Sequence, residues 1–400
     1  MTGTLLAAAL LIATPQASDR DRAQLLFHQA LDRHAELDVD RSLVLFLAAR
    51  DADLSYLPAH VEYIGETTKR TSMGLARLRA EYAELPDTPT VRCLRAYLTA
   101  ERENRPAAAD ALFEMEKTGE GGDCPTVLLS TLISDLRPTH TWSARQLAYL
   151  QRALEAAPGL FSLWTTYAAV LASSGRIEEA ERVLREAAAQ TSSHAVQRLR
   201  LNMRRAGLIL RRGDTTAAHA LWTAVRRAAE RDGRPGIHYV YLDELDSVLP
   251  IVNTADNTLD ATLRQKAELA ARHGEWVYEW LSRYTLAMRL TDRGAPLEAL
   301  PEYDRIITIA DSVGIGRYQT QAYYKRCRAL DRLGRLEDAE RDCLRAVEAS
   351  RRAESAYYVA EAYHTLLHVY DNAGRLTEAL VASDRFIDAV QPLEHSPLRM

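Results

Sequence analysis

The sequence GRLEDAE at Gly334–Glu340 has two close copies in the same chain, GAPLEAL at Gly294–Leu300 and GRLTEAL at Gly374–Leu380. The three glycines are evenly spaced, and an alanine stands five positions after each of them. A fixed period in this range predicts a repeat architecture. Glycine lets the backbone turn where one helix stops, and a small alanine lets the next helix pack closely on the first. Earlier versions of the phrase are GRIEEAE at Gly175–Glu181 and GDTTAAH at Gly213–His219.

The residues around these turns alternate between bulky and small in a constant order. In one unit the order is Trp164, Ala168, Leu171, Gly175, Ala180, Leu184 and Ala187. In later units it is Leu286, Ala287, Leu290, Gly294, Ala299 and Tyr303; Tyr323, Cys327, Leu330, Gly334, Ala339, Cys343 and Ala346; and Tyr363, Leu366, Tyr370, Gly374 and Ala379. In this order the chain, from about residue 160 to 391, resembles the tetratricopeptide repeat (TPR) family. Its period exceeds the family's usual length of about 34 residues, so we expect longer helices.

The resemblance implies an all-α fold, a right-handed α-solenoid of antiparallel helix pairs, and the spacing predicts about ten pairs. A composition rich in Ala, Leu, Glu and Arg favours helices as well. We expect divergent helical repeats at 19–118, a hinge and transitional helix pair at 119–159 that starts with GEGGD, and a regular solenoid at 160–400. Pairs are expected at 160–190, 195–231, 237–273, 276–311, 317–351 and 355–391.

The start of the chain carries an apolar run from Leu5 to Ala13 that is too short to span a bilayer. It suits the apolar part of a signal peptide at 1–18, although no basic residue precedes it. A frayed apolar helix or a misassigned start is the alternative. The protein is therefore expected to be periplasmic or secreted if this run is a signal peptide, and cytoplasmic otherwise. No other run is long enough for a membrane helix.

Four cysteines, Cys93, Cys124, Cys327 and Cys343, lack the C-x-x-C spacing of zinc sites. Cys327 and Cys343 fall on the two helices of one repeat and could face each other. The preferred interpretation is that the cysteines are small core residues. A disulfide becomes credible if the chain is exported.

The net charge and the absence of known motifs argue against nucleic-acid binding, catalysis and metal binding. A formal charge of −5 over 400 residues lacks the basic excess of nucleic-acid-binding proteins. No catalytic or nucleotide-binding motif is present, so we expect neither an enzyme nor a cofactor. His364 and His368 share a helix face, but only Asp371 could join them as a metal ligand, and no metal is expected. Asp243 and Asp246 in the segment LDELD follow the pattern of a half-solvated helix.

In TPR-like folds the first helix of each pair lines the concave groove, and this implies a protein-binding groove in the present chain. The residues expected to line it are Arg200, Met203, Arg204, Tyr284, Met288, Tyr324, Arg328, His364, His368 and Asp371. Tyrosine and arginine are types that contribute strongly to interfaces. The mixture suits a protein or peptide partner with acidic groups. The lysine and asparagine set of chaperone-tail-binding members is absent here, so that activity is not expected.

A basic stripe lies within residues 197–212. Arginines repeat at every seventh position at Arg198, Arg205 and Arg212, with Arg200, Arg204 and Arg211 beside them. We expect acidic residues on neighbouring helices to neutralise much of this stripe. A phosphate or acidic-peptide site is the alternative interpretation.

The leading functional interpretation is a non-catalytic scaffold or adaptor that binds protein or peptide. The second is a sensor or recruitment arm of a larger signalling protein, with a caspase-like peptidase, kinase or transcriptional regulator as output domain outside this chain. A helical enzyme is the third. The last predicted helix still shows Val381, Phe386, Ile387 and Val390. This predicts either a longer product or self-association through the C-terminal helix.

Overall fold

The computed structural model describes residues 18–70, 74–99, 105–133, 142–190, 194–248, 256–353 and 356–394. Over these ranges the chain forms helices and turns without a strand. The all-α solenoid of antiparallel helix pairs is therefore confirmed for the described residues. The predicted signal peptide at 1–18 falls outside the described part, except for Ser18. Among the described helices, none is both long and apolar enough to cross a membrane.

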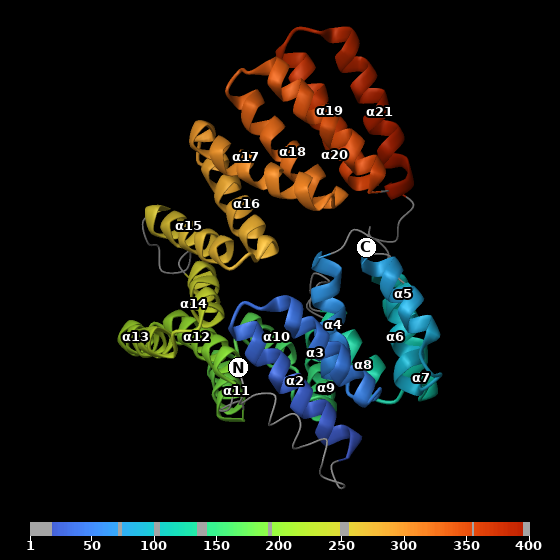
Figure 1. Cartoon of the computed structure of the whole chain (residues 1–400), viewed down its shortest axis with the longest axis vertical. Coiled ribbons are helices and arrows are strands. Elements are labelled where there is room, and N and C mark those ends of the chain that lie inside the picture. Colours follow the sequence, from blue (N-terminus) through green and yellow to red (C-terminus); the bar gives the residue numbers. More distant parts are fainter. Residues whose placement is uncertain are drawn as a thin grey trace. The chain divides into compact units, whose positions relative to one another are not determined.

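The chain divides into two compact units, and the first ends at Asn253. Figure 1 labels the helices of both units along the chain. Unit 1 contains α2 (Asp19–Ala35), α3 (Val39–Ala52), α4 (Leu57–Arg70), α5 (Gly74–Glu84), α6 (Pro89–Thr99), α7 (Arg105–Thr118), α8 (Cys124–Ile133), α9 (Trp142–Ala156), α10 (Phe161–Ser173), α11 (Ile177–Gln190), α12 (Ala195–Arg211), α13 (Thr215–Asp232) and α14 (Pro235–Val248). Unit 2 contains α15 (Asp256–Arg272), α16 (Trp276–Asp292), α17 (Pro296–Val313), α18 (Gly316–Arg332), α19 (Leu336–Arg352), α20 (Ala356–Asn372) and α21 (Leu376–Glu394).

The glycine turns have the conformation that the repeated phrase predicts. Gly294, Gly334 and Gly374 have φ values of 86°, 71° and 69°, in the left-handed region that glycine adopts without strain. The residue after each glycine donates a backbone hydrogen bond to the carbonyl five positions before it, as from Arg335 N to Leu330 O at 3.0 Å. This pattern closes the last turn of the first helix and redirects the chain into the second.

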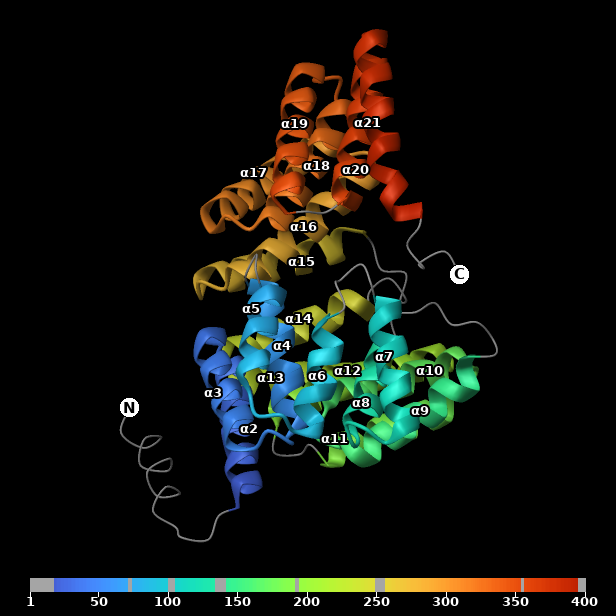
Figure 2. The ribbon, with the colours of Figure 1, turned by 90° about the vertical axis from the view of Figure 1, so that its right-hand side faces the viewer.

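Each helix pair packs on the pairs next to it, as α18 to α21 show in both views (Figures 1 and 2). The alanines of the repeated phrase lie at these contacts: Ala299 and Ala339 are fully buried, and Ala379 is 6% exposed. In unit 1, one continuous apolar core runs from Ala23 in α2 to Leu208 in α12. A smaller core joins Cys327, Leu330, Leu366 and Tyr370 in unit 2. Burial of neighbouring faces thus holds the array together.

The unit boundary differs from the expected hinge at 119–159. The turn at 119–123 lies within unit 1, where Gly121 is buried and packs against Pro125 and Cys93. The break lies instead between α14 and α15, which belong to different units. Consequently the helix pair expected at 237–273 is divided between the two units: within unit 1, α14 packs on α12 and α13, and within unit 2, α15 packs on α16.

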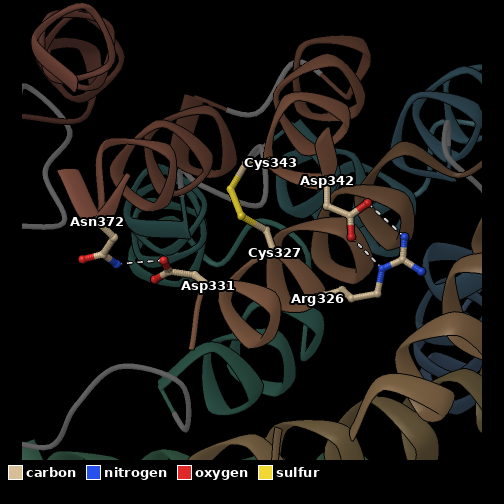
Figure 3. The surroundings of a disulfide bond; sticks show 6 residues. All are labelled: Arg326, Cys327, Asp331, Asp342, Cys343 and Asn372. Carbon is tan, nitrogen blue, oxygen red and sulfur yellow. Dashed lines mark hydrogen bonds and ion pairs between the residues drawn. A yellow bond between two sulfur atoms is a disulfide. The ribbon is translucent and has the colours of Figure 1, made fainter. Parts of the chain in front are cut away.

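The cysteines are paired, whereas the preferred interpretation was that they are small unpaired core residues. They are buried, but Cys93 is bonded to Cys124 and Cys327 to Cys343. Figure 3 shows the second disulfide between α18 and α19. That Cys327 and Cys343 face each other agrees with their places in the repeat. The repeat pattern does not predict the pairing of Cys93 with Cys124, because the helices that carry them, α6 and α8, are not consecutive: α7 lies between them in the sequence.

Candidate functional site

The first helices of three successive pairs, α16, α18 and α20, present equivalent positions at the constant spacing of the repeat. Two contacts show that these helices are neighbours. Tyr324 on α18 donates a hydrogen bond to Glu361 Oε2 on α20 at 2.6 Å. Arg332 Nη1 on α18 lies 3.7 Å from Asp292 Oδ1 on α16. One face of unit 2 is therefore built by three helices in register.

Equivalent residues on these helices form rows across that face. We call it the tyrosine face and define it by two rows, Tyr284, Tyr324 and His364, and Met288, Arg328 and His368, together with Gln321, Lys325, Tyr358 and Glu361. Each of these positions lies three or four residues from another one on the same helix, the spacing that places side chains on one side. Six of the seven expected residues of unit 2 thus belong to this face, and Asp371 is the exception.

Tyrosine hydroxyls cluster on this face. Burial raises the pKa of Tyr284 above its ordinary value, and the neighbouring hydroxyls of Tyr358, Tyr303 and Tyr324 raise it further. The ring of Tyr284 stacks on Trp280 with centroids 4.7 Å apart. Burial, followed by the hydrogen bond to Glu361, raises the pKa of Tyr324 to about 12. These tyrosines are therefore neutral hydrogen-bonding groups on a largely apolar base.

Two cations lie against Tyr324. The ammonium of Lys325 lies 4.9 Å from the ring centroid of Tyr324, and the guanidinium carbon of Arg328 lies 5.9 Å from it. Neither cation forms an ion pair with a carboxylate of the described residues. Burial lowers the pKa of Lys325, and the charge of Arg328 lowers it further, although Glu361 and Asp292 oppose this. The centre of the tyrosine face therefore has an excess of positive charge that an anionic group would relieve.

The histidines lie at the edge of this face. His364 and His368 are exposed, with ring centroids 4.7 Å apart in an edge-to-face arrangement. The ring of His364 also lies 5.4 Å from that of Phe386 on α21. Asp371 is exposed near the end of α20. No cluster of metal-ligating side chains occurs among the described residues, these three included.

In unit 1 the expected groove residues are engaged within the protein itself, either in ion pairs or in the core. Arg200 Nε and Arg204 Nε lie 3.8 Å and 3.2 Å from the two carboxylate oxygens of Glu244, which is 3% exposed. Both guanidinium groups thus neutralise one buried acid. The prediction for Met203 is wrong, because its side chain is fully buried in a core with Leu199 and cannot line a groove.

Four of the six arginines of the basic stripe pair with acids on other helices, in line with the expectation that much of the stripe is neutralised. Arg205 and Arg212 lie 3.3 Å and 3.0 Å from the two oxygens of Glu181 on α11. Arg200 and Arg204 share Glu244 on α14. These four arginines are therefore less available to a phosphate, which was the alternative interpretation of the stripe. The acidic segment LDELD contributes through Glu244, a residue that the pattern of Asp243 and Asp246 did not single out.

Lys325 is the functional candidate that the sequence pattern missed. It follows Tyr324 directly and lies four positions after Gln321, on the same side of α18. The repeat register carries no signal for it, because the equivalent residue on α16 is Thr285. Lysine is also rare in this chain, where only positions 69, 117, 266 and 325 carry it.

Comparison with known proteins found no matching family model and no matching curated protein. A solved signal-transduction ATPase with a tetratricopeptide repeat sensor, from Pyrococcus horikoshii, is 14% identical; the alignment covers 75% of this chain and 48% of that one, with a TM-score of 0.48. This chain thus spans about half the length of that protein. Human IFIT1 is 14% identical over 94% of this chain and 91% of its own, with a TM-score of 0.41. A Rap protein is 10% identical over 94% and 99%, also at 0.41.

This chain is built of TPR-like helical repeats. Its own antiparallel helix pairs and glycine turns show this. The TPR-like units differ in one respect that bears on binding. In unit 1 the arginines of the expected groove are occupied by Glu244, whereas in unit 2 Lys325 and Arg328 of the tyrosine face are not paired with an acid of the described chain.

Proposed function

We propose that the protein is a non-catalytic scaffold that binds an extended protein segment across the tyrosine face of unit 2. The observation that carries this proposal is the pair of cations, Lys325 and Arg328, beside Tyr324 on α18, the middle one of three helices in register. The arginines of the basic stripe on α12, in contrast, are held by the carboxylates of Glu181 and Glu244. Lys325 and Arg328 feel nearby acids such as Glu361, but no described carboxylate lies within ion-pair distance of either cation, so both are suited to an acid supplied by a partner.

The partner's chemistry follows from the same face. Lys325 and Arg328 favour an acidic side chain, and the exposed parts of Tyr284, Tyr358 and Met288 offer apolar and aromatic area beside it. Tyrosine adds hydrogen bonding at a low cost in side-chain entropy. An extended segment with an acidic residue next to an aromatic or aliphatic one fits these groups. Neighbouring positions within a row lie on adjacent helices, about one interhelical distance apart, so successive positions of a row can contact successive parts of one segment.

The test is selection of a random dodecapeptide display library on the full chain. We expect the retained peptides to be enriched in Asp or Glu beside an aromatic residue. Replacing both cations, as Lys325→Gln with Arg328→Gln, should weaken binding of a selected peptide by at least roughly tenfold, because centrally placed cations dominate such interfaces. Fluorescence anisotropy with the labelled peptide measures the change.

The matched control is Arg341→Gln with Arg345→Gln on α19, which removes the same number of cations from a helix outside the face. This variant should bind like the unaltered chain. Equal loss of binding in both variants would show that net charge alone attracts the peptide. Retained peptides without acidic residues would contradict the proposed partner chemistry.

We also propose that the protein is exported. All four cysteines are paired and buried, and such disulfides persist in oxidising compartments. The apolar run at Leu5–Ala13 supports the same proposal. When the full chain is expressed in a Gram-negative host, we expect it in the periplasm, cleaved close to Ser18, with no cysteine open to alkylation. Full-length protein in the cytoplasm with four alkylated thiols would be the opposite result.

A further inference from the structure

Unit 1 contains a contact between helices that are far apart in sequence. The end of α2 packs against the starts of α12 and α14. The backbones approach so closely that a Cβ on Gly236 would come within 2.5 Å of the carbonyl oxygen of His34 and 2.6 Å of that of Ala35. Ala35 enters the apolar core that otherwise belongs to α12, α13 and α14, with Val196, Leu199, Met203, Val225, Ala229, Ile237 and Val240. The first described helix is thus fastened to helices that begin only at Ala195 and Pro235.

The polar half of this contact contains two histidines side by side. The rings of His28 on α2 and His194, the N-cap residue of α12, have centroids 4.3 Å apart. One helical turn further along α2, Asp32 Oδ1 lies 3.3 Å from Arg234 Nη1. Arg234 also binds Asp232, with Nε and Oδ1 2.7 Å apart. Each element of the contact therefore brings a titratable or charged group to it.

The charges around the two rings leave little to stabilise a second positive charge. α2 supplies Asp32, α13 supplies Asp232, and the start of α14 is preceded by Arg234. Arg198 of α12 lies within electrostatic range of Asp232. Asp32 is the acid that acts on both rings, and it is already paired with Arg234. Two protonated imidazoles at this distance would repel each other and share one occupied carboxylate.

The titration of both rings follows from this arrangement. The His28 side chain is partly exposed, but the packing around it lowers its pKa, the charge of His194 lowers it further, and Asp32 opposes both. Burial lowers the pKa of His194 as well, again against Asp32. A histidine whose pKa is lower in the closed state than in the open state binds protons preferentially when open. The contact is therefore at full strength above the ordinary histidine pKa and weakens as the pH falls below it.

We propose that the contact of α2 with α12 and α14 is a latch that acid releases through His28 and His194. Release would separate α2 from the core around Ala35 and uncover the apolar side chains of Val196 and Ile237. The latch lies in unit 1 and uses no residue of the tyrosine face. A negative result for the latch would therefore leave the proposed peptide binding unaffected, and the reverse also holds.

Hydrogen exchange of the full chain at pH 7.5 and pH 5 tests the latch. After correction for intrinsic exchange rates, protection of the α2 amides should fall by roughly tenfold or more at the lower pH, while that of α18 and α19 stays constant. The double variant His28→Gln with His194→Gln should keep α2 equally protected at both pH values. His219→Gln, which replaces an exposed histidine on α13, should behave like the unaltered chain.

Two results would overturn the proposal. One is that α2 loses as much protection at pH 5 in the double variant as in the unaltered chain. The other is that α2 of the unaltered chain is equally protected at both pH values. A second measurement needs no variant. The imidazole resonances of His28 and His194 should titrate below the ordinary histidine pKa in the unaltered protein. Titration of either ring at or above that value would contradict the latch even if the double variant did not fold.

Discussion

Arg326→Ala is expected to lower the free energy of unfolding of unit 2 by about 3–5 kcal/mol. The guanidinium holds Asp342 from two sides, with Nε 2.6 Å from Oδ2 and Nη2 2.9 Å from Oδ1 (Figure 3). Asp342 is 2% exposed, so removal of Arg326 leaves a buried carboxylate without its bidentate partner. That residue must then be protonated or drawn into water, and either outcome destabilises α18 against α19.

Urea titration followed by hydrogen exchange of the α18 and α19 amides measures this change. Arg341→Ala is the control, because Arg341 contacts Asp338 on the exposed side of α19, and exposed pairs add little. It should leave the exchange of these amides nearly unchanged. Equal effects of the two substitutions would mean that the burial of Asp342 has no energetic consequence.

Loss of the disulfide between Cys327 and Cys343 is expected to have the second largest effect. The two residues are 16 apart in sequence, and a cross-link of that loop length stabilises by about 3 kcal/mol, mainly by restricting the unfolded chain. Cys327→Ala with Cys343→Ala should therefore lower the urea midpoint of unit 2. Alanine is preferred to serine because both positions are fully buried and a hydroxyl would need a partner.

Reduction of the unaltered protein provides the control for this prediction. Dithiothreitol should lower the urea midpoint of unit 2 in the unaltered chain and leave that of the alanine variant unchanged. The bond between Cys93 and Cys124, which are 31 apart in sequence, should have an effect of similar size in unit 1. An unaltered chain that is equally stable with and without the reductant would refute both predictions.

The helices and turns could be predicted from the sequence because their signals are local. Each glycine turn depends on one residue with positive φ and on an alanine five positions later, as at Gly334 and Ala339. The ends of most helices agree with the expected ends to within a few positions for the same reason. The shared side of Tyr284, Tyr324 and His364 follows from the constant spacing of the repeat.

The features that could not be predicted depend on contacts between distant segments. Met203 and Arg204 are adjacent in sequence, and only the packing of α12 against its neighbours decides that one is buried and the other pairs with Glu244. The break between α14 and α15 carries no glycine phrase, and nothing in the sequence marks it as a boundary between units rather than an ordinary loop. The bond between Cys93 and Cys124 requires α6 and α8 to meet past α7. In each case tertiary packing, rather than local propensity, determines the outcome.

The register of α16, α18 and α20 has a genetic consequence. Recombination that adds or removes one whole repeat would preserve every row of the tyrosine face while changing its length. Insertion of a single codon within α18 would instead rotate the side chains beyond it by about 100° and misalign them with both neighbours. Changes in copy number are therefore the tolerated route by which such an array evolves a longer or shorter recognition surface.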